Sequence, residues 1–506
     1  MLAKVTSAAL VGLDSVPVEV EVDVASQGLP NFFIVGLPDE AVREARERVR
    51  SAIKNSGADF PAKRITVNLA PADLPKEGPS YDLPIALGIL LASGQLPSLQ
   101  QSAMVLGELA LDGTVRKING VLSHALLARE RHIDALFIPR DCAKEASCIA
   151  GITIFPVDNL GTLLGHLSGQ QLISTYPYNP IDTQVTQQTY DHDLQDILGQ
   201  EKAKRALEIA AAGGHNMLMK GPPGSGKTLL ARTLPSILPA LTFPEILELT
   251  KIYSVSSLGN NGFVTKRPFR SPHHTTSSVA IIGGGSIPKP GEISLAHRGI
   301  LFLDELPEFP RIVLESLRQP IEDGFVTVSR AQGRFTFPAK AMIIAAQNPC
   351  PCGYLGDNTR TCICNPAQII RYQKKISGPL LDRIDIHIDV PKVETSTLTT
   401  RLPAESSSTV RARVQKARDR QLQRFTGTSL SSNADMTSKD IKLFCSLDQK
   451  SLDILKKAVD LLGLSARSYF RIIKLARTIA DLEESNDILP QYIAEALQYR
   501  VKQHTL

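Results

Sequence analysis

The sequence has few of the features that mark secreted or membrane-spanning proteins. It has 7 cysteines in 506 residues, an odd number too small for a disulfide framework, which favours a reducing compartment. The longest apolar stretch, residues 83–91, is too short to span a bilayer, and the N-terminus lacks the basic start and apolar core of a signal peptide. We therefore expect a soluble cytoplasmic protein with no membrane partner.

Neither sign of charge dominates the chain. The 56 Lys and Arg residues against 51 Asp and Glu residues give a net charge of +5. This balance permits nucleic-acid binding without predicting it, so a local basic surface would have to supply the affinity. The length suits about three domains, and a hydrophobic content of 43% gives each of them material for a core.

The most informative motif is GPPGSGKT at residues 221–228, which fits the G-x-x-x-x-G-K-[ST] phosphate loop. An apolar, strand-like run precedes it and a helix-like run follows it. The glycines let backbone N–H groups turn toward the phosphates, the lysine reaches the β and γ oxygens, and the threonine hydroxyl binds Mg²⁺. The motif predicts ATP and Mg²⁺ as cofactors. The predicted nucleotide-binding residues are Gly221, Pro222, Pro223, Gly224, Ser225, Gly226, Lys227 and Thr228.

Two further strand ends complete a hydrolytic site. The apolar run 300–303 ends in Asp304, predicted to hold Mg²⁺, and Glu305, predicted to act as general base on the attacking water. The run 341–346 ends near Asn348, a polar side chain suited to lie between Glu305 and the γ-phosphate. The alternatives are an ordinary acidic turn at the first strand and a turn residue before a proline at the second.

Composition divides the chain into four parts. Residues 1–170 alternate between strand-like and helix-like segments and predict an α/β domain, and the polar segment 171–193 is interpreted as a linker. Residues 194–392 form the predicted ATPase core. Residues 393–506 begin with a polar stretch and continue as a helical region, interpreted as a lid.

Several helices can be placed by pattern. A helix over 39–56 carries Arg and Glu at i, i+4 spacing and is expected to be solvated. A basic helix over 410–424 has an apolar stripe that we expect to dock, leaving its charges in water. Thr437 and Asp440 have capping-box spacing at the start of a lid helix.

Four cysteines lie within 15 positions of one loop and are candidate zinc ligands. Two close pairs suit a tetrahedral site, although a C-x-C spacing is tighter than the usual C-x₂-C. The alternative is free thiols in an irregular loop. The four are Cys350, Cys352, Cys362 and Cys364.

Two segments are candidate DNA contacts. Residues 324–337 alternate like a β-hairpin, and Arg330 and Arg334 flank its turn, where they could follow phosphates; the alternative is a solvated hairpin tip. A second segment contributes Lys266 and Arg267. The adjacent histidines 273 and 274 are interpreted as surface or packing residues, with ligation as the alternative.

The motifs together resemble a known family. Residues 291–309 (GEISLAHRGILFLDELPEF), with PFRSPHHT at 268–275 and NPCPCGY at 348–354, are similar to the magnesium-chelatase-like AAA+ ATPases of the YifB/ComM group. The resemblance covers nearly the whole chain. It implies an α/β multidomain fold with a Lon-protease-like N-terminal domain, an AAA+ phosphate-loop ATPase module and a C-terminal helical lid, assembled as a homo-oligomeric ring, a hexamer.

The resemblance also assigns roles. It makes Asn348 the sensor-1 residue, Arg467 the sensor-2 residue, and Arg383 an arginine finger supplied to the γ-phosphate of the neighbouring subunit. It implies a DNA motor, more narrowly a branch-migration helicase in recombination and natural transformation. A chelatase-like ATPase that remodels a protein partner is the alternative.

An ATP-dependent protease is a further alternative that the sequence disfavours. Ser80 lies in a segment similar to the catalytic serine segment of Lon proteases, which work with a Ser/Lys dyad. Leu122 occupies the place of the lysine, and Lys117 nearby is in the wrong register. We therefore expect the N-terminal domain to lack proteolytic activity.

Overall fold

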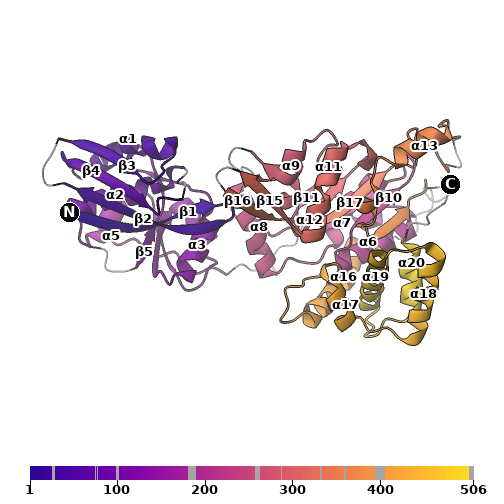
Figure 1. Ribbon diagram of the computed structural model, residues 1–506. Helices are drawn as coiled ribbons and strands as arrows, with labels where there is room; N and C mark the ends of the chain where they lie inside the picture. Colours follow the sequence, from indigo (N-terminus) through magenta and orange to yellow (C-terminus); the bar gives the residue numbers. More distant parts are fainter. Residues whose placement is uncertain are drawn as a thin grey trace. The chain divides into compact units, whose positions relative to one another are not determined.

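The computed structural model describes residues 1–25, 29–74, 76, 78–98, 102–180, 190–256, 262–285, 288–330, 333–357, 360–393 and 405–500 (Figure 1). It divides into two units. Unit 1 comprises residues 1–185, 243–264 and 329–335, and unit 2 comprises residues 186–242, 265–328 and 336–506. Two short segments of the predicted ATPase core thus belong to unit 1, while the lid helices belong to unit 2 with the ATPase sheet.

Unit 1 is built on a seven-stranded mixed sheet with strand order β3-β4-β2-β1-β5-β8-β9. β1, β2 and β4 pair antiparallel, and the remaining neighbours pair parallel. A small hairpin, β6 with β7, lies outside this sheet. The strands are β1 (Leu2–Val11), β2 (Asp14–Val24), β3 (Asn31–Val35), β4 (Arg64–Ala70), β5 (Ala103–Val105), β6 (Glu108–Leu109), β7 (Val115–Arg116), β8 (Ala135–Pro139) and β9 (Thr153–Val157).

Two hydrophobic clusters pack in unit 1. One joins β1, β2 and β4 to α1 and α2, and every residue of α2 is buried. The other joins β5 and β8 to α3 and α4, and α8 packs on α3. The helices are α1 (Glu40–Asn55), α2 (Asp82–Ala92), α3 (Val121–Glu130), α4 (Arg140–Ala146), α5 (Leu160–Leu167) and α8 (Phe243–Val255).

Unit 2 contains a five-stranded parallel sheet with strand order β11-β14-β17-β10-β18. Because all five strands run the same way, their carboxyl ends meet at one edge. β14 and β17 are almost wholly buried, as expected of strands covered on both faces. The strands are β10 (Met217–Lys220), β11 (Phe269–Arg270), β14 (Ile300–Leu303), β17 (Met342–Gln347) and β18 (Ile386–Asp389).

Short helices and ribbons surround this sheet. β12 (Gly283–Gly284) pairs with β13 (Lys289–Pro290), and β15 (Phe325–Arg330) pairs with β16 (Gly333–Pro338) as the hairpin predicted over 324–337. The turn residues 331 and 332 lie outside the described residues. The helices are α6 (Glu201–Gly213), α7 (Lys227–Ile237), α9 (Ser278–Ile282), α10 (Glu292–Leu295), α11 (Arg311–Ser316), α12 (Arg318–Asp323), α13 (Pro366–Gln373) and α14 (Gly378–Leu381).

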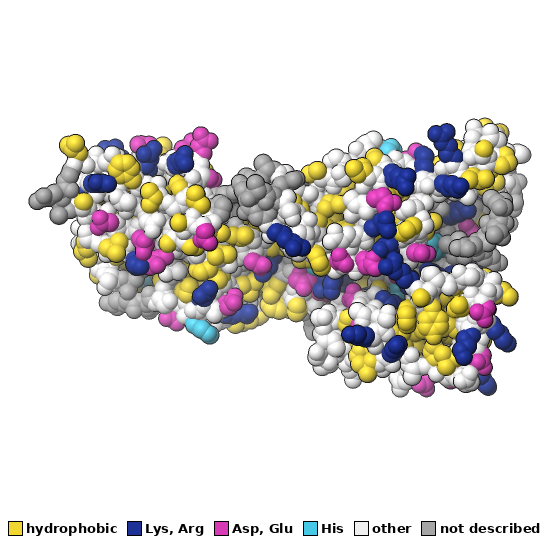
Figure 2. All heavy atoms as spheres, in the orientation of Figure 1, with side chains coloured by type: hydrophobic (Ala, Val, Ile, Leu, Met, Phe, Trp, Pro, Cys, Tyr) yellow, Lys and Arg dark blue, Asp and Glu magenta, His cyan; other side chains and the backbone are white. Residues whose placement is uncertain are grey.

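The C-terminal region is helical and packs on α6 (Figure 1). Its hydrophobic residues continue the core of the ATPase sheet in one cluster. Figure 2 shows apolar side chains gathered on the surface of this region near α18 and α20. Leu461, near the end of α18, is 86% exposed. The helices are α16 (Ser407–Arg424), α17 (Ser438–Phe444), α18 (Gln449–Leu462), α19 (Ala466–Leu482) and α20 (Pro490–Gln498).

Predicted local features agree with the structure in several places. The helix over 39–56 is α1, capped by Asp39. The basic helix is α16, whose stripe of Val410, Val414 and Ala417 is buried. Thr437 and Asp440 form the capping box of α17. Among the described residues, every helix is too short or too polar to cross a bilayer.

Candidate nucleotide site and arginine pair

The phosphate loop, residues 221–228, joins β10 to α7 at the carboxyl-terminal edge of the five-stranded sheet. Gly224 and Gly226 have φ angles of 76° and 89°, left-handed values that favour glycine. A Cβ atom on Gly221 would lie 2.1 Å from the Val390 carbonyl oxygen, so a larger residue does not fit where the loop leaves β10. The glycines therefore allow the tight backbone conformation of the loop, and the first turn of α7 directs backbone N–H groups into the loop.

Lys227 lies at the centre of this loop. Its Nζ is 2.8 Å from the carbonyl oxygens of Gly221 and Pro222 and 3.3 Å from Asn348 Oδ1. Burial lowers the pKa of the Lys227 ammonium, and the two carboxylates that follow β14 act in the opposite direction. The buried Ser225 hydroxyl has no hydrogen-bond partner among the described residues. A buried ammonium and an unpaired hydroxyl inside a glycine turn fit a bound phosphate group.

The acid pair meets the phosphate loop across the sheet edge. Thr228 Oγ1 donates to Asp304 Oδ2 at 2.8 Å, so the two predicted Mg²⁺ ligands are in contact. Asp304 Oδ1 accepts the Glu305 backbone N–H at 2.9 Å. Glu305 has a left-handed φ of 51°, an uncommon conformation for a residue with a side chain, and such outliers cluster at functional sites. Its carboxylate is 55% exposed and therefore accessible to water.

His274, interpreted from the sequence as a surface or packing residue, lies beside this glutamate. His274 Nδ1 is 3.5 Å from Glu305 Oε2. The His274 ring is fixed by His273, with ring centroids 4.1 Å apart, and by the edge of Phe309. His274 follows β11, which neighbours β14 in the parallel sheet, so both residues come from loops at the same edge. Two adjacent loop histidines gave no signal in the sequence that one of them faces Glu305.

The structure separates the two predicted arginines from the phosphate loop. Arg383 precedes β18, and its backbone carbonyl accepts Asn216 Nδ2 at 3.2 Å, where Asn216 precedes β10. Because β10 and β18 are parallel, Arg383 lies at the amino-terminal edge of the sheet and the phosphate loop at the carboxyl-terminal edge. Arg467, in the first turn of α19, lies with Arg383 and not with the phosphate loop, since both donate to Glu322.

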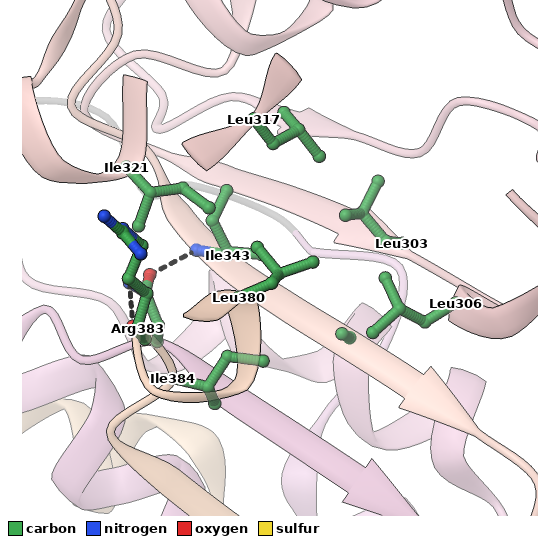
Figure 3. Close-up of a pocket in the computed structure, with 10 residues that line it drawn as sticks. Leu303, Leu306, Leu317, Ile321, Ile343, Leu380, Arg383 and Ile384 are labelled. Atoms are coloured by element: carbon green, nitrogen blue, oxygen red, sulfur yellow. Dashed lines mark hydrogen bonds between the residues drawn. The ribbon is translucent and has the colours of Figure 1, made fainter. Parts of the chain in front are cut away.

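Arg383 is largely enclosed by its surroundings. Figure 3 shows it at one end of a small apolar pocket, next to Ile321 and Leu380. Its Nη1 donates to the Pro379 carbonyl at 2.7 Å and its Nη2 to Glu322, whereas Nε has no partner among the described residues. The side chain is only 8% exposed.

The four clustered thiols form a compact set. The Sγ atoms of Cys350 and Cys352 are 3.4 Å apart, those of Cys350 and Cys362 are 3.7 Å apart, and those of Cys352 and Cys362 are 3.6 Å apart. With Cys364, all four lie within 4.8 Å of one another. Ligands about 2.3 Å from a tetrahedral Zn²⁺ are about 3.8 Å apart, so this spacing fits zinc. The other described cysteines are buried in the cores.

This cysteine loop touches the phosphate loop. It begins directly after Asn348, and Cys350 is fully buried. A Cβ atom on Gly353 would lie 2.6 Å from Pro223 Cδ, so the two backbones approach closely there. The position of Asn348 and of one wall of the phosphate loop thus depends on how the cysteine loop is folded.

The predicted DNA contacts differ in their surroundings. Arg334 is exposed on β16, and the side chain of Arg330 lies outside the described residues. Arg267 donates to the backbone carbonyls of Pro239 and Arg298 at 2.7 and 2.6 Å, so its guanidinium holds the fold of these loops together. Lys266 Nζ lies over the Tyr190 ring at 6.0 Å from its centroid.

The structure also shows the surroundings of the Lon-like segment. Leu122, at the place of the Lon lysine, is fully buried in the hydrophobic cluster around α3. The backbone carbonyl of Ser80 accepts the Gly107 N–H at 3.0 Å. Lys76 is fully buried, and its Nζ donates to the Pro71 carbonyl.

The parallel sheet, the glycine loop and the acid pair together define a phosphate-loop nucleoside-triphosphatase site. Comparison with known proteins gives the family. Residues 193–398 match the family described as magnesium chelatase, subunit ChlI; residues 20–142 match subunit ChlI of Mg-chelatase, and residues 404–500 match its C-terminal region. The chain belongs to the magnesium-chelatase-like YifB/ComM family, and this membership indicates an ATPase that uses ATP and Mg²⁺.

Individual relatives span nearly the whole chain. Uncharacterized protein YifB of Escherichia coli is 45% identical over 99% of this chain and 97% of its own length. Competence protein ComM of Haemophilus influenzae is 46% identical over the same shares. A weaker similarity, 24% identity over 33% of this chain and 18% of the relative, connects it to a Lon protease of Mycoplasmopsis agalactiae.

Proposed function

We propose that the chain is a cytoplasmic, ring-forming, ATP-driven motor on DNA, and more narrowly a branch-migration helicase of homologous recombination and natural transformation. The observation that carries the proposal is that Arg383 and the phosphate loop lie at opposite edges of one sheet. In a ring, hexameric by our proposal, the arginine edge of one copy meets the phosphate loop of the next. The 46% identity to a competence protein supports the role in transformation.

Within each centre the residues of this chain have distinct roles. Lys227 and the loop N–H groups would hold the triphosphate, and Thr228 and Asp304, already in contact, would hold Mg²⁺. Bound Mg²⁺ would neutralise charge on the phosphate oxygens. Glu305 accepts the proton of the attacking water, and Asn348, 3.3 Å from Lys227, orients the γ-phosphate.

The neighbouring copy supplies positive charge. Arg383, as an arginine finger, stabilises the charge that develops on the γ-phosphate during cleavage. Arg467 lies beside it and reaches the same interface. ATP binding then closes the interface and hydrolysis opens it, which moves the hairpins of successive copies.

A mixing experiment tests the shared centre. Lys227→Ala removes the phosphate loop function of a copy and Arg383→Ala removes its finger, so each variant alone should be nearly inactive. In randomly mixed rings about a quarter of the interfaces combine an intact loop with an intact finger, and ATPase activity should return to that level. Glu305→Gln mixed with Lys227→Ala is the control, because both lesions lie on the loop side. No recovery with Arg383→Ala would contradict the proposal.

The DNA part is tested separately. We propose that two arginines on the hairpin of β15 and β16 follow the phosphates of the translocating strand. They are Arg330 and the exposed Arg334. Single-stranded or branched DNA should stimulate the ATPase, and replacing both arginines by alanine should weaken binding and flatten its salt dependence. Lys266 is a second proposed contact. Arg267→Ala should mainly lower thermal stability, because its guanidinium holds backbone carbonyls.

We infer that unit 1 contains a Lon-like domain without protease activity. The weak similarity to Lon proteases supports the relationship, and the buried Leu122 supports the loss of the dyad base. Ser80→Ala should therefore leave every activity of the protein unchanged. Peptide hydrolysis that disappears in this variant would overturn the inference.

We propose that the four clustered cysteines bind a zinc ion. Their Sγ distances of 3.4–3.7 Å and their approach within 4.8 Å support a closed tetrahedral site. Metal analysis of the purified protein should give about one equivalent of zinc per chain. Folded protein with less than about a tenth of an equivalent would reject the site.

Remodelling of a protein partner is the second candidate function. The family description as a magnesium chelatase subunit favours it. An ATPase rate unaffected by DNA, together with no salt-sensitive DNA binding, would select this function over the DNA motor.

A further inference from the structure

One carboxylate binds the two predicted catalytic arginines. Glu322, on α12, accepts Arg383 Nη2 at Oε2 and Arg467 Nη2 at Oε1, the latter at 3.1 Å. The three residues come from separate elements: α12, the turn between α14 and β18, and the first turn of α19. The contact brings the guanidinium groups of the ATPase core and of the lid to one point.

The charges in this cluster do not cancel. The hydrogen bond from Arg383 lowers the pKa of the Glu322 carboxyl, and the charges of Arg467 and Arg471 lower it further. The carboxyl is therefore ionised at neutral pH, and one negative charge faces two bound guanidinium groups. The cluster keeps a net positive charge at the amino-terminal edge of the sheet, as a site that meets a triphosphate requires.

The lid does not depend on Glu322 for its attachment. α19 is already anchored by Arg471, which donates to the buried Asp385 at 2.6 Å, and by His215 Nε2, which lies 2.8 Å from Thr478 Oγ1. The pair of Glu322 with Arg467 is exposed on both sides, at 46% and 56%, and adds little to folding stability. The pair with Arg383, which is only 8% exposed, also compensates a nearly buried guanidinium. Glu322 therefore orders both arginine side chains, while α19 stays attached through its other contacts.

We infer that Glu322 is a positioning residue that holds Arg383 and Arg467 together so that both enter the neighbouring copy's phosphate site as a pair. The inference rests on the proposed function, because it requires the arginines to act across an interface. Two long side chains held by one acceptor lose less conformational freedom when the phosphate arrives. Among the described contacts, those of Glu322 are with Arg383 and Arg467 and include neither the phosphate loop nor Glu305, so its effect passes through the arginines.

The first test separates catalysis from binding. Glu322→Ala should lower kcat about tenfold and leave the nucleotide Kd unchanged, measured well below a thermal midpoint that falls because Arg383 loses its acidic partner. Glu322→Gln, which keeps the shape and one acceptor oxygen, should be intermediate and serves if the alanine variant does not fold. Glu315→Gln is the matched control, since Glu315 pairs with Arg318 at 2.7 Å on the neighbouring helix. Unchanged or raised kcat in both Glu322 variants would overturn the inference.

The second test asks which copy Glu322 serves. An equal mixture of Glu322→Ala and Lys227→Ala proteins should be about threefold more active than Glu322→Ala alone, because the Lys227→Ala copies supply intact arginine pairs to intact phosphate loops. A fall to about half would show that Glu322 acts on its own loop and would overturn the inference. The mixture of Arg383→Ala with Lys227→Ala is run beside it. If the Arg383→Ala and Lys227→Ala mixture recovers no activity, the shared centre is contradicted, and the inference with it. If that mixture recovers activity but the Glu322→Ala and Lys227→Ala mixture does not, only the role of Glu322 is rejected.

Discussion

His274 Nδ1 lies 3.5 Å from the carboxylate Oε2 of Glu305. An imidazole held by His273 and Phe309 thus restricts the side chain that we propose as general base. His274→Asn should lower kcat about fivefold, the effect of losing about 1 kcal/mol of side-chain positioning, without changing nucleotide affinity. His132→Asn, at an exposed histidine of unit 1, is the control. Steady-state kinetics with equal kcat for the two variants would remove this role.

Glu305→Gln should abolish turnover and preserve ATP binding. The amide keeps the size of the side chain and cannot accept the proton of water, and a general base contributes about 10²–10⁴-fold to rate. Binding of a fluorescent ATP analogue and ATPase rate measure the two properties separately. Glu308→Gln, in the same turn and paired with Lys375 at 3.0 Å, should keep its activity. Activity of the Glu305 variant near wild type would exclude this residue as the base.

Loss of the cysteine cluster should weaken nucleotide binding. Gly353 packs against Pro223 of the phosphate loop, and Asn348 directly precedes the cysteine loop, so a disordered loop would leave both without support. We expect Cys352→Ser to lower the zinc content and to raise the Kd for ATP several-fold. Ile363→Ala, at an 88% exposed position between two of the cysteines, is the control. An unchanged Kd in zinc-free, folded protein would show that the two loops are independent.

Mild acid should destabilise unit 1 through His124. Burial lowers the pKa of this imidazole from 6.5 to about 4. Between these values the unfolded chain binds a proton that the folded chain does not, so stability is lost as pH falls from 6.5 to 4 and is constant above that window. The loss is at most about 3 kcal/mol.

Urea denaturation at pH 7 and pH 4.5 measures this loss. The loss of stability between pH 7 and pH 4.5 should be smaller in His124→Asn and unchanged in His132→Asn. His132 is exposed, and its left-handed φ of 52° tolerates asparagine. The same pH dependence in all three proteins would assign the effect to other groups.

The sequence predicted those parts of the candidate site that are built from residues adjacent in the chain. The phosphate loop needs glycines at fixed spacing, and Gly221, Gly224 and Gly226 each have a local steric reason to be glycine. The carboxylates Asp304 and Glu305 follow directly from the end of an apolar strand, and the hairpin over 324–337 from alternation.

Contacts between distant residues that belong to no sequence motif could not be predicted. Glu322 meets Arg383 across 61 positions and Arg467 across 145, and nothing in the local sequence of α12 signals either contact. The docking of α19 through Arg471 and Asp385 fixes where Arg467 lies, and a sequence pattern gives the helix without its partner. The meeting of His274 with Glu305 likewise depends on β11 lying beside β14.

The segments 243–264 and 329–335 belong to unit 1 although they interrupt the ATPase sequence, so the chain passes between the units at five places. Leu247 and Phe263, from the first of these segments, pack on the hydrophobic cluster around α3 and α4. A fragment cut after residue 185 would leave that cluster bare and prone to aggregate. Residues 1–185 are therefore not a self-sufficient domain, and transferring them to another protein would require carrying Leu247 and Phe263 with them.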